Sequence, residues 1–282
     1  MSDIELGCSS APWGKEGLIN SLSDVERAGF RGIETTAEVV EQFEDRVAVF
    51  NEILVQHRLE LTAIVAGGSK WPGMNLDEEV ERGVNVARFL KSAGAKVLVL
   101  YPPRPNPEQE MEDELDLLPA ATAYGEIARR TQEQGVATCL HPEVGTLVDS
   151  PRMIDKFIQM ADPEAMKLCV DIGFLAEAKV PMASFLREHR KRLGHVHLKD
   201  IRGKDMKPRK YTGKGKHKVL SHPHVSELGK GDLDLEEFVE LVMDENYSGW
   251  MTVEFDSEKG RANAHLAAAC YRYAEQHLDL VL

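Results

Sequence analysis

Three kinds of feature are scarce in this sequence of 282 residues, and each absence excludes a class of protein. The four cysteines are far apart and form no short pairing motif, which favours reduced thiols over a disulfide framework. No apolar run is long enough for a membrane span or a secretory signal. Basic residues number 34 against 47 acidic ones, and the net charge of -13 disfavours binding to nucleic acid or to acidic membranes. We therefore expect a cytoplasmic protein that acts on a small molecule.

Internal repeats, low-complexity segments and linkers are also missing, so we expect one domain over residues 1–282. Eight short apolar segments have the character of strands, and each is followed by a helical stretch. The predicted strands are residues 4–8, 32–35, 61–66, 96–101, 136–141, 168–171, 195–199 and 251–255. This alternation predicts an α/β protein with a single (β/α)8 TIM barrel.

Two long loops interrupt the alternation, after strands 4 and 7. Residues 102–119 are proline-rich and then acidic, whereas residues 202–231 are strongly basic in their first half. Both loops follow strands on the face where barrel active sites lie. They could close over the site, dock subunits in a homo-oligomer, bind an anionic partner, or carry only solvated charge. We favour contact between loops or subunits because acids and bases are segregated.

Four predicted strands carry a metal-binding side chain at the same end. These side chains are Glu143, Asp171, His197 and Glu254. Each lies on the face opposite the bulky apolar residues of its strand, and parallel neighbours in a barrel would bring all four to one point. Three carboxylates and one imidazole suit a fairly hard divalent ion. We expect one Mn²⁺ ion, with Mg²⁺ or Co²⁺ as alternatives.

Such an ion suggests a reaction as well as a site. A divalent ion can chelate the carbonyl and the adjacent hydroxyl oxygen of a sugar, and it stabilises the enediolate that forms when the proton between them is removed. Glu143 and Glu254 come from strands three apart, so one could remove a proton on one face of the substrate while the other returns it on the opposite face. We therefore predict that both glutamates are catalytic, as in an epimerase or isomerase.

Five further side chains are candidates for substrate binding: Trp13, Glu34, His195, Lys199 and Arg202. Lys199 points inward and could in principle form a Schiff base, but the nearby acids should keep it protonated. We assign it to substrate oxygens or to the enediolate. Glu34 and Trp13 could line the pocket, or serve only in packing and hydrogen bonding. His195 and His141 lie two residues deeper than their partners, where a hydrogen-bonded core histidine is an equally good interpretation.

Several motifs carry a resemblance to a known family. They are GFRGIET at 29–35, HPEVGT at 141–146, HVHLKDIR at 195–202, GKGDLDLEEF at 229–238 and YSGWMTVEFD at 247–256. The sequence resembles the xylose isomerase-like TIM barrel superfamily of sugar isomerases and epimerases, and within it the inosose dehydratases. In the epimerase members Glu, Asp, His and Glu at the ends of strands five to eight hold the metal. The resemblance implies that Glu143, Asp171, His197 and Glu254 do the same, with the two glutamates also acting as acid and base.

Two positions depart from the family pattern. Members commonly have histidine where this chain has Phe174, and inosose dehydratases usually have histidine where it has Glu143. The second change makes the site resemble that of an epimerase. We therefore expect a divalent-metal-dependent isomerase or epimerase of a keto-sugar or keto-polyol. The alternatives are an inosose dehydratase-like lyase that eliminates water from a keto-polyol, and a non-catalytic sugar-binding barrel.

Overall fold

The computed structural model describes residues 4–106, 114–203, 211–212, 219–220, 223–278 and 280. The acidic residues between 108 and 113 and the basic residues between 204 and 218 lie outside the described residues. The expected contact between the two charged loops therefore stays a prediction.

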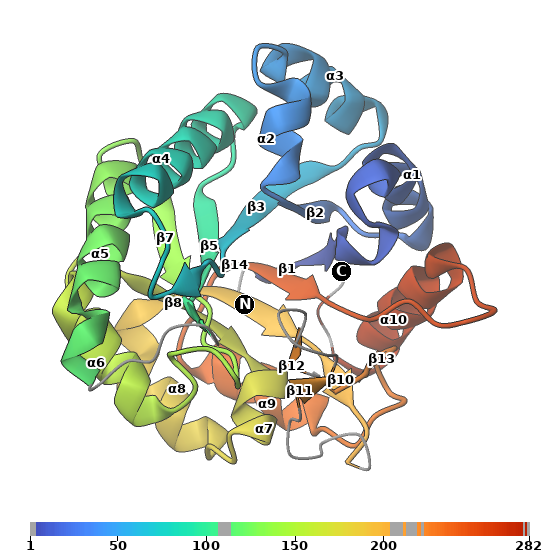
Figure 1. The fold of residues 1–282 in the computed structure, drawn as a ribbon. Coiled ribbons are helices and arrows are strands. Elements are labelled where there is room, and N and C mark those ends of the chain that lie inside the picture. Colours follow the sequence, from blue (N-terminus) through green and yellow to red (C-terminus); the bar gives the residue numbers. More distant parts are fainter. Residues whose placement is uncertain are drawn as a thin grey trace.

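Eight parallel strands close into a barrel in the order β1-β14-β9-β8-β7-β5-β3-β2 (Figure 1). These strands are β1 (Ile4–Ser9), β2 (Gly32–Thr36), β3 (Glu60–Gly67), β5 (Val97–Tyr101), β7 (Ala137–Leu140), β8 (Lys167–Asp171), β9 (Leu193–Leu198) and β14 (Gly249–Val253). Each matches one predicted strand, and the predicted fold class is confirmed. The strands that were expected to carry metal ligands, β7, β8, β9 and β14, are consecutive neighbours in the barrel.

Helices surround the barrel on its outside (Figure 1). They are α1 (Leu18–Ala28), α2 (Glu38–Phe43), α3 (Val47–Gln56), α4 (Leu76–Ala93), α5 (Leu118–Gln132), α6 (Pro151–Ala161), α7 (Ile172–Glu177), α8 (Met182–His189), α9 (Leu235–Asp244) and α10 (Asn263–His277). Short 3-10 helices are η1 (Ala11–Trp13), η2 (Lys15–Gly17), η3 (Glu114–Leu117) and η4 (Arg190–Arg192). Two helices, α2 and α3, follow β2, and Arg46 between them has a non-helical backbone conformation with φ -127° and ψ 33°.

Alternation along the strands separates two packed layers. Ala63, Val99, Cys139 and Cys169, from four adjacent strands, form a small buried cluster of their own inside the barrel. The opposite faces of the strands pack against helices in a much larger core. All four cysteines are buried and none is bridged. This part of the barrel interior is therefore filled with small apolar side chains.

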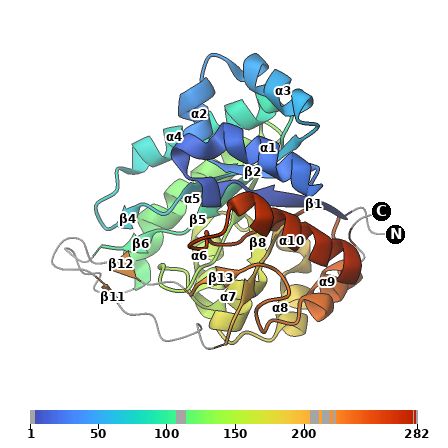
Figure 2. The same cartoon turned by 90° about the vertical axis from the view of Figure 1, so that its right-hand side faces the viewer.

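Short strand pairs lie near the carboxyl ends of the barrel strands. They are β4 (Lys70–Trp71) with β6 (Arg104–Pro105), β10 (Asp200–Ile201) with β13 (Val225–Ser226), and β11 (Tyr211–Thr212) with β12 (Val219–Leu220). Figure 2 shows β4 and β6 beyond the end of the barrel that is opposite the start of β1. Within the described residues, no helix has both the length and the apolar character that crossing a membrane would need.

Candidate active site

A pocket of about 470 Å³ opens at the carboxyl ends of the barrel strands. Four of its lining residues, His141, Asp171, Lys199 and Glu254, end or directly follow β7, β8, β9 and β14. Deeper in the same strands lie apolar side chains, together with the buried polar residues His195, His197 and Thr252 of β9 and β14. The carboxyl ends of the strands form the end of a (β/α)8 barrel at which active sites occur.

The position at which β7 ends determines whether His141 or Glu143 lies close to Asp171 and Glu254. The strand ends at Leu140, and the backbone N–H of His141 makes the last contact to β5, to the carbonyl of Leu100 at 2.9 Å. Pro142 has no N–H to continue the ladder. Glu143 then enters a turn in which its own carbonyl accepts a hydrogen bond from the Thr146 backbone at 3.1 Å. The strand therefore carries His141 at its end, and Glu143 lies beyond it.

Four donor groups converge beside the pocket. The ligand atoms of His141, Asp171, His197 and Glu254 all lie within 4.8 Å of one another. Nε2 of His141 is 3.0 Å from Oδ2 of Asp171, and Nδ1 of His197 is 3.4 Å from Oε2 of Glu254. The structure thus brings together three of the four predicted ligands, with His141 in the group where Glu143 was expected.

The chemistry of this group fits a divalent ion. Nδ1 of His197, the ring nitrogen that faces Glu254, is buried and has no hydrogen-bond partner among the described residues, which is an arrangement that a buried polar atom rarely keeps without a ligand or water. Two imidazoles and two carboxylates form a mixed nitrogen and oxygen set that suits Mn²⁺, Co²⁺ or similar ions. The cluster could therefore hold a divalent metal ion.

Glu34 positions one of the imidazoles from behind. Its Oε2 atom is 2.9 Å from Nε2 of His197 and 3.2 Å from Nε2 of His195, which also lies 3.1 Å from the Thr252 hydroxyl. Burial alone would raise the pKa of Glu34, but His197 and His195 outweigh it and hold that pKa at about 2. A carboxylate that holds one ring nitrogen leaves the other free for a metal. Glu34 and His195, both predicted to bind substrate, are thus buried and outside the pocket lining.

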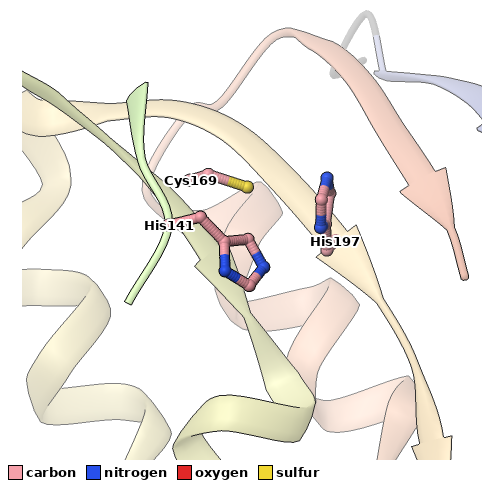
Figure 3. Close-up of side chains that lie close together, drawn as sticks. All are labelled: His141, Cys169 and His197. Atoms are coloured by element: carbon pink, nitrogen blue, oxygen red, sulfur yellow. The ribbon is translucent and has the colours of Figure 1, made fainter. Parts of the chain in front are cut away.

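A second, deeper grouping shares the two imidazoles. His141, Cys169 and His197 approach one another inside the barrel, as Figure 3 shows, and their donor atoms also lie within 4.8 Å. Burial raises the pKa of the Cys169 thiol to about 11, which disfavours the thiolate that binds metals. Because the same histidines serve both groupings, one ion would occupy one or the other. The four-residue group is the better candidate, since three of its members also line the pocket.

Lys199 lies between two of the carboxylates. Its Nζ atom is 2.6 Å from Oδ2 of Asp171 and 2.6 Å from Oε2 of Glu254. Burial would lower the pKa of Lys199, but the two carboxylates raise it well above its usual value. Burial would likewise raise the pKa of Asp171, whereas Lys199 and His141 hold it well below its usual range. The two contacts and the raised pKa both favour the charged ammonium form of Lys199.

Glu143 lines the pocket from one side. Its Oε2 atom is 3.4 Å from a guanidinium nitrogen of Arg104, which the pairing of β6 with β4 places at the pocket wall. The Glu143 side chain remains about a quarter exposed, whereas Asp171 is almost fully buried. Glu143 is thus available to a molecule in the pocket without belonging to the four-residue group. Arg104 was not predicted, because its two-residue strand has no pattern of its own in the sequence.

Trp13 and Arg202, two of the predicted substrate-binding residues, lie outside the pocket lining. Trp13 donates from Nε1 to Asp24 at 2.8 Å, and its ring meets the edge of Phe255 with centroids 5.8 Å apart. Since Phe255 lines the pocket, Trp13 supports the wall from behind. Arg202 donates from Nε to the carbonyl of Lys230 at 3.0 Å. Phe174, where the family commonly has histidine, does line the pocket.

Asp200 fixes the chain directly after Lys199. Its carboxylate accepts hydrogen bonds from the backbone N–H groups of Gly229 at 2.9 Å, Gly231 at 2.8 Å and Leu233 at 3.3 Å. A Cβ atom on Gly231 would lie 1.9 Å from Oδ1 of Asp200, so only glycine fits there. These contacts join two of the motifs noted in the sequence, HVHLKDIR and GKGDLDLEEF, and hold the segment that carries Lys199.

Comparison with known proteins agrees with the barrel fold. Residues 22–273 match a family described as the xylose isomerase-like TIM barrel. An inosose dehydratase from Clostridium perfringens is 26% identical over 300 residues, covering 99% of each chain. An inosose dehydratase from Clostridium beijerinckii is 27% identical over 282 residues, covering 92% of each chain.

Solved structures show the same fold at lower sequence identity. A D-allulose 3-epimerase from Methylomonas sp. superposes with a TM-score of 0.75 at 16% identity, covering 99% of both chains. A probable 3-DHS dehydratase from Bacillus anthracis superposes with a TM-score of 0.74 at 13% identity, covering 96% of this chain and 98% of that one. At such identities the likeness concerns the fold.

Proposed function

Because the chain belongs to the xylose isomerase-like TIM barrel family, we propose that it is a divalent-metal-dependent enzyme that removes a proton beside the carbonyl group of a keto-polyol. One observation carries this proposal: His141, Asp171, His197 and Glu254 converge next to a pocket that Glu143 also lines. A retained set of metal-binding groups has little use in a non-catalytic sugar-binding barrel, and the relatives are enzymes.

The four converging residues are the proposed ligands. A divalent ion held there would polarise the substrate carbonyl and stabilise the negative charge of the enediolate. We propose Mn²⁺ first, with Co²⁺ next and Mg²⁺ last, because two imidazoles bind Mg²⁺ poorly. Glu34 would keep the His197 ring in its binding orientation, as a carboxylate behind a ligating histidine does.

Glu143 is the proposed base. It faces the pocket, it lies outside the group of ligands, and Arg104 steadies its carboxylate. It would accept the proton from the carbon next to the substrate carbonyl. The ammonium of Lys199, at the pocket floor, would face the substrate oxygens that become negative as this proton leaves. In this proposal His141 binds the metal ion and Glu143 transfers the proton.

We favour elimination of water as the fate of the enediolate. The inosose dehydratases that match this chain over nearly its full length support this outcome. After Glu143 takes the proton, a carbon–carbon double bond would form as the C–O bond to the hydroxyl on the next carbon breaks, and the hydroxyl would leave as water with the proton that Glu143 had accepted. The second candidate is isomerisation or epimerisation, in which the proton returns to carbon. It is supported by Glu254, a second carboxylate that lines the pocket three strands away from β7.

Incubation in heavy water separates these outcomes. The Mn²⁺-loaded protein would be mixed with inosose and, separately, with keto-sugars, and products would be identified by mass spectrometry and proton NMR. Loss of one water from the substrate is the expected result. Deuterium at the carbon beside the carbonyl, with the formula otherwise unchanged, would favour isomerisation or epimerisation. Absence of both changes with every substrate tested would contradict the proposed proton removal.

A further inference from the structure

Lys199 contacts the same carboxylate oxygens that face the histidines of the proposed metal site. Oδ2 of Asp171 is 2.6 Å from Nζ of Lys199 and 3.0 Å from Nε2 of His141. Oε2 of Glu254 is 2.6 Å from the same Nζ and 3.4 Å from Nδ1 of His197. The other carboxylate oxygen of Asp171 accepts a hydrogen bond from the backbone of Phe174 at 3.1 Å. Oδ2 is therefore the oxygen of Asp171 that is turned toward both the imidazole and the ammonium.

Geometry limits how far apart an ion and this ammonium could be. An ion bonded to either oxygen at about 2.1 Å would lie no more than about 5 Å from Nζ, because the two distances share the same oxygen. Two cations this close repel strongly where little water screens them, and the Lys199 side chain is only 15% exposed. Lys199 and a bound ion would therefore compete for the same two carboxylate oxygens.

We propose that Lys199 is a built-in counter-cation of the metal site, which holds Asp171 and Glu254 in place until an ion arrives and is then displaced from at least one of them. Without a cation, the buried carboxylates would repel each other and lose their solvation. With the ion present, the displaced ammonium moves toward the pocket that it already lines. Loading the metal therefore makes the lysine available to the substrate. The inference rests on the proposed metal site but not on the proposed reaction.

Manganese titration of purified protein tests the competition without any substrate. The variants are Lys199→Met, which removes the charge, and Lys199→Arg, which keeps it. Lys191→Met removes one exposed positive charge near the start of β9, at the opposite end of that strand. Free Mn²⁺ is measured by electron paramagnetic resonance. Lys199→Met should bind Mn²⁺ about ten- to a hundredfold more tightly than wild type, because one repelling charge is gone. The other two variants should stay within about threefold of wild type.

Equal or weaker binding by Lys199→Met would overturn the role of Lys199 while leaving the metal site intact. Failure of wild-type protein to bind Mn²⁺, Co²⁺ or Mg²⁺ would overturn both. Crystal structures of the wild type with and without Mn²⁺ decide the question even if the variants do not fold. With the ion bound, at least one of the two 2.6 Å contacts of Nζ should be broken. Persistence of both contacts beside a bound ion would refute the displacement.

Discussion

Nε2 of His141 lies 3.0 Å from Oδ2 of Asp171, and both side chains are almost fully buried. This contact places an imidazole at the end of β7 among the proposed metal ligands. Glu143, two residues further along, instead meets Arg104 at the pocket wall. His141 and Glu143 are therefore only two residues apart in the sequence but have different surroundings, and we expect them to have different functions.

Substitution separates these functions. His141→Ala removes a proposed ligand, so Mn²⁺ affinity should fall at least about tenfold. Glu143→Gln keeps the shape of the side chain but removes the base, so kcat should fall by about 10²- to 10⁴-fold while Mn²⁺ affinity stays within about threefold. Calorimetric titration and initial rates with the substrate identified in heavy water provide the two measurements. The reverse pattern, with affinity lost in Glu143→Gln and kept in His141→Ala, would make Glu143 the ligand.

Substitution of Glu34 tests whether its contact with His197 contributes to metal binding. Glu34→Gln should lower Mn²⁺ affinity by about ten- to a hundredfold, because an amide holds the His197 ring less firmly than a carboxylate does. Glu60→Gln, at the exposed start of the neighbouring strand β3, is the matched control and should bind like wild type. Equal affinity in the two variants would show that Glu34 does not act on the metal site.

The strand pattern was enough to predict the barrel and three of the four converging residues. It could not choose between His141 and Glu143, because a period of two puts both on the inward face. That choice depends on where β7 ends, which is set by its last hydrogen bond to Leu100 and by Pro142. The sequence also could not show that Glu34 supports His197. The two residues are 163 positions apart and meet only because the barrel closes.

Lowering the pH should reduce the free energy of unfolding of the protein without metal, and Glu34 should account for part of this loss. Its pKa is lowered from 4.5 to about 2 because the favourable effect of His197 and His195 outweighs burial, which acts in the opposite direction. A carboxyl group with a lowered pKa in the folded state stabilises the fold above its unfolded pKa, and this contribution is lost as pH falls toward the folded value. The difference in free energy of unfolding between wild type and Glu34→Gln should therefore shrink between about pH 4.5 and pH 2. Urea unfolding at a series of pH values measures it, and a constant difference would contradict the assignment.

The three backbone hydrogen bonds of Asp200 should contribute far more to the free energy of unfolding than the single backbone hydrogen bond of Asp234. Asp200→Asn replaces one acceptor oxygen by an NH₂ group that faces backbone N–H donors of Gly229, Gly231 or Leu233. We expect a loss of about 1.5–3 kcal/mol in the free energy of unfolding, the range for hydrogen bonds to charged groups. Asp234 caps α9 through a single bond to the Glu237 backbone, and asparagine caps equally well, so Asp234→Asn should change stability by less than about 0.5 kcal/mol. Urea unfolding of both variants gives the comparison. Equal stability of the two would show that the segment after Lys199 is held by other contacts.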